Sequence, residues 1–217
     1  MADIFNEVDE EVRREQLKKL WDKYQNYIIA VVIVTVVAVG GWRAYQWRQA
    51  KEAARAGAAF DQAMTLSAAG KHAEAEAAFA KIAQEGSRGY RELARMQAAG
   101  EIAQRDAKAG VQAYDAIASD QRLSQSLRDL AAVKAATLLV DTEPYDNMRQ
   151  RLEAAAAPDR TYRHTARELL AVSAWRANDA AVARKWAEMI NGDPAAPPDM
   201  QRRMQMLLAL LVENAKS

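Results

Sequence analysis

The two histidines and the glutamates beside one of them are the side chains of this chain that could do acid–base or metal chemistry. His72 precedes Glu74 and Glu76, whereas His164 lies among arginines that would repel a metal cation. A zinc site gathers several His, Cys, Asp or Glu ligands, and neither histidine has a second ligand at suitable spacing. Glutamates on a lysine-flanked helix are typical of a solvated surface. We therefore predict that His72 is solvated, and we predict no catalytic residue, metal ligand or cofactor-binding residue.

The motifs of the common enzyme classes are absent as well. The chain contains no HExxH, GxSxG, GxxxxGK[ST] or GxGxxG, so it lacks the usual metalloprotease, hydrolase and nucleotide-binding signatures. It has no cysteine, which excludes disulfides and thiol catalysis. Lys and Arg number 30 and Asp and Glu 29, a balance that gives no reason to expect nucleic acid. We predict a non-enzymatic protein without cofactor or small-molecule substrate; an enzyme with an unrecognised site is the alternative.

Arginines and aromatic side chains form the one cluster that suggests binding, because these residue types are enriched at the centres of protein interfaces. Tyr162 and Trp175 alternate with four arginines on or beside one predicted helix. These arginines are Arg160, Arg163, Arg167 and Arg176. They could form a surface for a protein partner. They could also form a solvated charged face whose aromatic rings turn into the core.

Helices must position these residues, because the chain after Trp42 has the composition of helix. Alanine is very frequent, Gly numbers 9 and Pro only 5, and alanine has the highest helix propensity. Helix-breaking residues separate segments of roughly 12 to 20 residues, as expected of stacked helical hairpins. The predicted joints lie at 69–70, 86–89, 109–110, 141–144, 158–159, 178–179 and 191–194.

A spaced pattern of a small residue, a larger side chain and an isoleucine recurs along these segments. The first copy recurs after 35 residues and again after 108; a copy near 130–156 is poor. The predicted repeat-packing residues are Gly70, Ala75, Phe79, Ile82, Gly110, Tyr114, Ile117, Ala183 and Ile190. A period near 34 is that of the tetratricopeptide repeat. The predicted fold is an all-α solenoid of degenerate tetratricopeptide-like hairpins, with a plain helical bundle as the alternative.

The segment 199–216 is predicted to form one further helix after Pro197 and Pro198. Its apolar stripe consists of Met204, Leu207, Leu208, Leu211 and Val212. Solenoids require a cap on the last repeat, and the stripe suits that role. A docking face for a partner is the alternative.

A charge-free apolar segment lies between Lys23 and Arg43. Its nineteen residues would span roughly 28 Å as a helix, close to the hydrocarbon thickness of a bilayer. Aromatic residues flank it, as at membrane–water interfaces: Trp21, Tyr24, Tyr27, Trp42, Tyr45 and Trp47. We predict a tail over 1–23, a transmembrane helix over 24–42 and the repeat domain over 43–217.

The charges that flank this segment give only a weak indication of its orientation in the membrane. Five Lys or Arg residues precede it within about twenty residues and four follow it, so the positive-inside rule leans toward a cytoplasmic N-terminus. Repeats in the cytosol are the alternative. A signal peptide cleaved near Ala38-Val39-Gly40 is a further alternative, although the segment before it is long and net acidic.

The order of these features resembles the YfgM-like family of bacterial inner-membrane proteins. The resemblance covers nearly the whole chain and rests on Glu7–Glu11, Gly41-Trp42-Arg43, Gly70-Lys71, Ala75–Phe79, Glu168-Leu169-Leu170, Asn178-Asp179 and Ala183-Arg184. It implies an ancillary subunit of the Sec translocon, with a cytoplasmic tail and periplasmic repeats that work beside a membrane-anchored periplasmic chaperone. It implies no catalytic site. A coordinator of cell-envelope growth or division is the alternative function.

Overall fold

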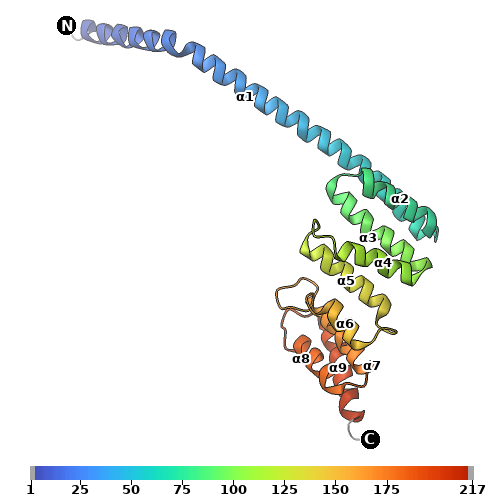
Figure 1. Ribbon diagram of the computed structural model, residues 1–217. Helices are drawn as coiled ribbons and strands as arrows, with labels where there is room; N and C mark the ends of the chain where they lie inside the picture. Colours follow the sequence, from blue (N-terminus) through green and yellow to red (C-terminus); the bar gives the residue numbers. More distant parts are fainter. Residues whose placement is uncertain (1–2, 215–217) are drawn as a thin grey trace. The chain divides into compact units, whose positions relative to one another are not determined.

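The computed structural model describes residues 3–214, and these residues form helices and turns without any strand (Figure 1). The all-α prediction is therefore confirmed for this part of the chain. Residues 1–2 of the predicted tail and 215–217 of the predicted repeat domain lie outside the described residues. The helices are α1 (Asp3–Ala68), α2 (His72–Glu85), α3 (Arg88–Arg105), α4 (Ala107–Ala118), α5 (Gln125–Leu139), α6 (Tyr145–Leu152), α7 (Arg163–Arg176), α8 (Ala180–Asn191) and α9 (Pro198–Asn214).

The chain divides into two units, residues 1–54 and residues 55–217, and α1 runs through both. In the first unit α1 is long and apolar enough to cross a membrane, by length and composition, with a mean hydropathy of 2.0 in its most apolar window. Apolar side chains are exposed around its whole circumference, among them Val31, Val34 and Val37 at 65%, 67% and 68%. The predicted interface aromatics are also exposed: Trp21, Tyr24, Tyr27, Trp42, Tyr45 and Trp47.

The second unit is a series of helical hairpins. The end of α1 packs with α2 and α3 around Phe79, and α3 and α4 form the next hairpin. The pairs α5–α6 and α7–α8 follow, and α9 packs on α8 (Figure 1). Each hairpin contributes to an apolar cluster that the next hairpin completes. A chain of this kind stacks neighbour on neighbour, as the sequence predicts.

Eight of the nine predicted repeat-packing residues are buried. They are Ala75, Phe79 and Ile82 of α2, Gly110, Tyr114 and Ile117 of α4, and Ala183 and Ile190 of α8. The side chain that Gly110 lacks would clash with Ala103, so α4 crosses α3 there at close range. The predicted joint at 109–110 is therefore wrong, because Gly110 serves helix packing. The turn lies at Asp106, which caps α4 by accepting from Ala109 N at 3.1 Å.

Gly70 is the exception among the predicted packing residues, because it lies exposed in the turn between α1 and α2. Its φ is +74°, and Lys71 N donates to Leu66 O at 3.0 Å. Asn178 repeats this geometry 108 residues later, with φ +59° and the next residue's N–H donating to Ala174 O at 2.9 Å. This left-handed helix end closes both hairpins in the same way.

The poor third repeat has a structural reason. Its second helix, α6, has only eight residues and begins after Pro144. Met148 and Leu152 are fully buried and fill the core with two side chains. Residues 153–162 then form turns in place of further helix. A short helix followed by a long connection interrupts the period of the sequence repeat, while the helical hairpins remain stacked.

The helix α9 covers the last hairpin with one face, as predicted. Met204, Leu207 and Leu211 are buried against Ala187 and Ile190 of α8. Two members of the predicted stripe are less enclosed: Leu208 is partly buried and Val212 is 42% exposed. The prediction of a start at Asp199 is one residue late, since α9 begins at Pro198, where proline is favoured because the first helical N–H needs no partner.

The two left-handed turns predict opposite effects for two substitutions. Gly70→Ala should lower the free energy of unfolding by about 1–2 kcal/mol, because an L side chain is strained at this φ. Asn178→Gly should raise it by several tenths of a kcal/mol. Urea unfolding of the full chain in a neutral detergent measures both. Gly89→Ala is the control: Gly89 lies in α3 beside open space, so alanine should stabilise there. Equal effects of the two Gly→Ala changes would contradict the turn assignment.

Candidate protein-interaction surface

The four arginines predicted to form a partner surface lie on α7 and on the loop before it, and acceptors of the same chain engage them. Asp193, in the loop between α8 and α9, is the centre of this arrangement. Its Oδ2 lies 3.0 Å from Arg163 Nε and 2.8 Å from His164 Nε2. Its Oδ1 accepts from Ala195 N at 2.9 Å. The hydrogen bonds from Arg163, His164 and Ala195 hold the pKa of Asp193 well below its usual range.

Arg167 is buried, with 4% of its surface exposed. Its Nε donates to Ala156 O at 2.9 Å, and its Nη1 lies 3.9 Å from Asp193 Oδ2. Burial, reinforced by the charge of Arg163, lowers the pKa of Arg167. A charge removed from water is retained when hydrogen bonds and an opposite charge compensate it. Arg167 therefore fixes the 153–162 loop to α7, and a partner cannot reach it.

The other two predicted arginines also serve the stack. Arg160 lies 3.6 Å from the buried carboxylate of Asp129 on α5. Arg176 donates to the backbone carbonyls of Val140 and Glu143, at the turn between α5 and α6. That turn holds carbonyls left without helical partners. The cluster that the sequence predicts as a partner surface thus ties the fourth hairpin to the third.

The predicted aromatic companions separate in the structure. Trp175 is 40% exposed at the end of α7. Tyr162 is partly buried and packs against the cluster around Leu170. Trp186 of α8 is also partly buried, and its Nε1 donates to Tyr145 Oη at 3.0 Å.

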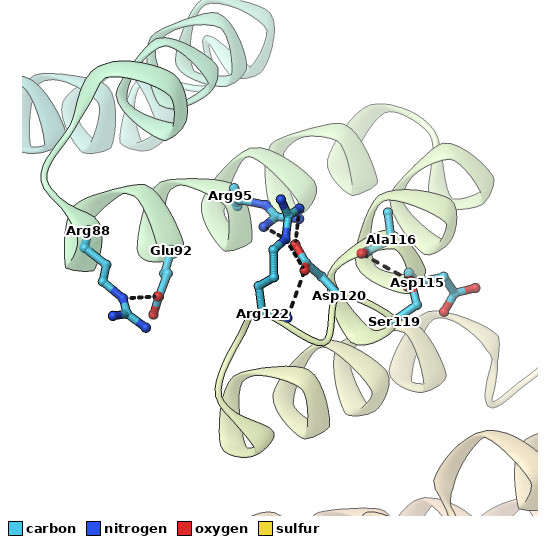
Figure 2. A network of polar contacts seen from close by, with 8 residues as sticks. All are labelled: Arg88, Glu92, Arg95, Asp115, Ala116, Ser119, Asp120 and Arg122. Atoms are coloured by element: carbon cyan, nitrogen blue, oxygen red, sulfur yellow. Dashed lines mark hydrogen bonds and ion pairs between the residues drawn. The ribbon is translucent and has the colours of Figure 1, made fainter.

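A second cluster, centred on an aspartate, was not predicted from the sequence. Asp120, in the turn between α4 and α5, lies at the same point of its hairpin as Asp193, 73 residues earlier. Arg95 Nη1 donates to its Oδ2 at 2.9 Å, and Arg122 Nε donates to its Oδ1 at 2.9 Å (Figure 2). Arg122 N also donates to Oδ1, as Ala195 N does at Asp193. These bonds hold the pKa of Asp120 well below its usual range, chiefly through Arg122 and then Arg95.

The signal for this cluster was present in the sequence. Asp120 and Asp193 each follow an isoleucine of the repeat pattern, Ile117 and Ile190, by three residues. An aspartate that accepts from the N–H two residues later is a common way to close a turn. Extending the repeat pattern by these three residues would have identified both turns.

A third cluster corrects the prediction that His72 is solvated. His72 Nδ1 lies 2.7 Å from Glu101 Oε2, and Ser67 Oγ donates to Glu101 Oε1 at 2.5 Å. Glu101 is only 6% exposed. Burial, with the charge of Glu101 as the second cause, raises the pKa of the nearby Tyr114. The cluster joins the end of α1, the start of α2 and the C-terminal part of α3.

None of these clusters has the composition of a metal site. Among the described residues, no group of three or more His, Cys, Asp or Glu side chains could hold a metal ion. Each carboxylate is instead surrounded by guanidinium, hydroxyl, amide or imidazole groups. The arrangement can bind ionic groups and hold helices in register.

The depressed pKa of Asp193 predicts a pH-dependent contribution to stability. An aspartate whose folded pKa lies below its unfolded value of about 3.9 stabilises the fold above that pH, and the contribution is lost as the pH falls below it. Asp193→Asn should therefore lower the melting temperature at pH 7, and the gap to the unsubstituted chain should narrow as the pH falls below about 4.

Asp146→Asn is the matched control, because the Asp146 side chain is 86% exposed on α6. It should change the melting temperature little at either pH. Thermal unfolding of the full chain in neutral detergent, followed by circular dichroism, gives these values. A gap for Asp193→Asn that stays constant with pH would contradict the assigned role.

Comparison with known proteins identifies the repeat architecture. A family model described as the tetratricopeptide repeat-like domain matches residues 18–185. No curated protein and no solved structure matches the chain. Domains of this type are generally protein-interaction modules. Because the match covers well over half of the sequence, the chain belongs to the tetratricopeptide repeat-like domain family.

Proposed function

We propose that this protein is a membrane-anchored interaction subunit that brings its repeats to protein partners at a bacterial inner membrane. One observation carries the proposal: the helix that exposes the apolar segment also supplies the first helix of the repeat unit. Residues 24–42 of α1 expose valines all round, whereas Ala63 near its end is fully buried in the first hairpin. A helix apolar on all sides is suited to lipid.

Confinement to a membrane supports a binding role, because it raises the effective concentration of the repeats near other membrane proteins. The partners we propose are the Sec translocon and a membrane-anchored periplasmic chaperone, as the resemblance to the YfgM-like family implies. The tail is then cytoplasmic and the repeats are periplasmic. No catalytic step is part of this function.

The membrane anchor predicts a sharp effect of charge in the apolar segment. Val34→Arg combined with Val37→Arg should prevent insertion, since an arginine at the centre of a transmembrane helix costs about 2.5–3.5 kcal/mol. A reporter that is active only in the periplasm, fused after Ser217, should be active in the unsubstituted chain and inactive in the double variant. The chain should also sediment with membranes without detergent.

The matched control introduces the same charges on α9. Leu210→Arg with Val212→Arg changes side chains that are 45% and 42% exposed, and reporter activity should persist. Activity of a cytosolic reporter at the same position would reverse the proposed orientation. If the unsubstituted chain stayed in the supernatant at full length, the proposed membrane anchor would be contradicted.

The proposed partners predict the outcome of affinity capture. The tagged full-length chain, solubilised in a mild detergent that keeps the translocon intact, should recover translocon components and a periplasmic chaperone. Recovery is measured by quantitative mass spectrometry. The control carries an unrelated single-span helix in place of residues 24–42. If the control recovered the chaperone without translocon components, the chaperone would bind the repeats, and contact with the translocon would require residues 24–42. Recovery of neither by the native chain would reject the Sec assignment.

A further inference from the structure

We propose that five arginines of the second and third hairpins form a docking surface for an acidic segment of a protein partner. These residues, called the arginine surface below, are Arg88, Arg91, Arg95, Arg122 and Arg128. The proposal rests on the interaction function proposed above, and not on the identity of the partners. It names the chemistry that the repeats would recognise.

Three of the arginines share one face of α3. Arg88, Arg91 and Arg95 follow one another at steps of three and four residues, which places them side by side along a helix. Arg88 is 82% exposed at its side chain and lies 3.5 Å from Glu92. Arg91 donates to Gly86 O at 3.2 Å, an uncharged acceptor. Figure 2 shows Arg88 and Arg95 along the same helix.

The other two arginines come from the α4–α5 turn and the start of α5. Arg122 reaches back from the turn toward α3, so that Arg95 and Arg122 meet at one carboxylate, Asp120 (Figure 2). The Arg122 side chain is 89% exposed. Arg128 donates to two neutral amide oxygens, those of Gln121 and Gln125. Its charge therefore has no carboxylate among these contacts.

The charges of the arginine surface do not cancel. Five guanidinium groups share two carboxylates, Glu92 and Asp120, which leaves three positive charges. The whole chain has a net charge of only +1, so the excess is local. The Asp193 cluster differs, because its arginine Arg167 is buried, whereas the Arg122 side chain is 89% exposed.

An acidic protein segment fits this surface better than a lipid headgroup does. A guanidinium binds a carboxylate through two parallel hydrogen bonds, and Asp120 already receives such a pair from Arg122. Binding to anionic lipid is typical of uninterrupted clusters of basic residues. Here Glu92 and Asp120 lie between the arginines and would repel a uniformly anionic membrane. A flexible acidic segment can place its carboxylates on the unneutralised arginines and avoid both.

A peptide titration of the full-length chain tests the proposal. The chain is reconstituted in phosphatidylcholine nanodiscs, and a short Glu-rich peptide is titrated by calorimetry. The same peptide with Gln at every Glu is the uncharged comparison. We expect the Glu-rich peptide to bind and the Gln peptide not to bind. Binding of the Glu-rich peptide should weaken as added salt shortens the electrostatic screening length from about 10 Å at 0.1 M to about 3 Å at 1 M.

Three members of the arginine surface are then neutralised: Arg91 and Arg128, whose hydrogen-bond acceptors are uncharged, and Arg122, which shares Asp120 with Arg95. Arg91→Gln, Arg122→Gln and Arg128→Gln together should weaken binding about tenfold, which corresponds to about 1.4 kcal/mol. Asp120 keeps its bond from Arg95 in this variant. The matched control removes the same charge elsewhere by Arg149→Gln, Lys185→Gln and Arg202→Gln, and should bind nearly as well as the unsubstituted chain. Thermal unfolding checks that both variants are folded.

Three outcomes would overturn the proposal: no binding of the Glu-rich peptide, equal weakening by both triple variants, or preferential capture of phosphatidylglycerol vesicles through the same arginines. The last result would assign the surface to lipid. The test is independent of affinity capture from cells. Peptide binding at the arginine surface without recovery of translocon components would leave the docking surface in place and reject only the Sec partner.

Discussion

Close approach of helices at small side chains is the constraint on which the repeat unit depends. The fully buried positions include Ala63, Ala75, Ala131 and Ala183, and Gly110 lies where any side chain would clash with the neighbouring helix. Small residues let two helix axes come near each other. Each contributes little apolar area, at about 0.8 kcal/mol per buried CH₂ group. The large apolar side chains that are fully buried include Phe79, Met148, Leu152, Leu170, Ile190 and Leu211, so alanine and a few large side chains share the contacts between hairpins.

Ionic contacts between helices accompany this alanine-rich core. Glu76 of α2 pairs with an arginine of α3, Asp115 of α4 with one of α6, and Glu168 of α7 with Arg203 of α9. These pairs join residues 29 to 36 positions apart, which is about one repeat. An alanine-rich solenoid can therefore keep its register through polar side chains at the helix edges. This explains why arginines that look like a partner surface in the sequence are engaged within the chain.

The sequence predicts the helical class and most of the repeat register, because both follow from local properties. Helix propensity, turn residues and the spacing of Phe79 and Tyr114 act over a few residues and survive in a single sequence. The errors arise where one residue type serves two purposes. Glycine ends a helix at Gly70 but permits a close crossing at Gly110, and only the position of the neighbouring helix distinguishes the two.

The charged clusters show the same limit more strongly. Arg167 and Arg122 are both arginines near the start of a helical repeat, yet one is buried at 4% exposure and the other has a side chain that is 89% exposed. What separates them is the acceptor within reach: Arg167 meets a backbone carbonyl in a long loop, whereas Arg122 lies in a tight turn at the edge of the hairpin. The long loop exists because α6 stops after eight residues. A local loss of helix in the third repeat thus leaves Arg167 buried against a long loop, whereas the intact α4–α5 turn leaves the Arg122 side chain exposed.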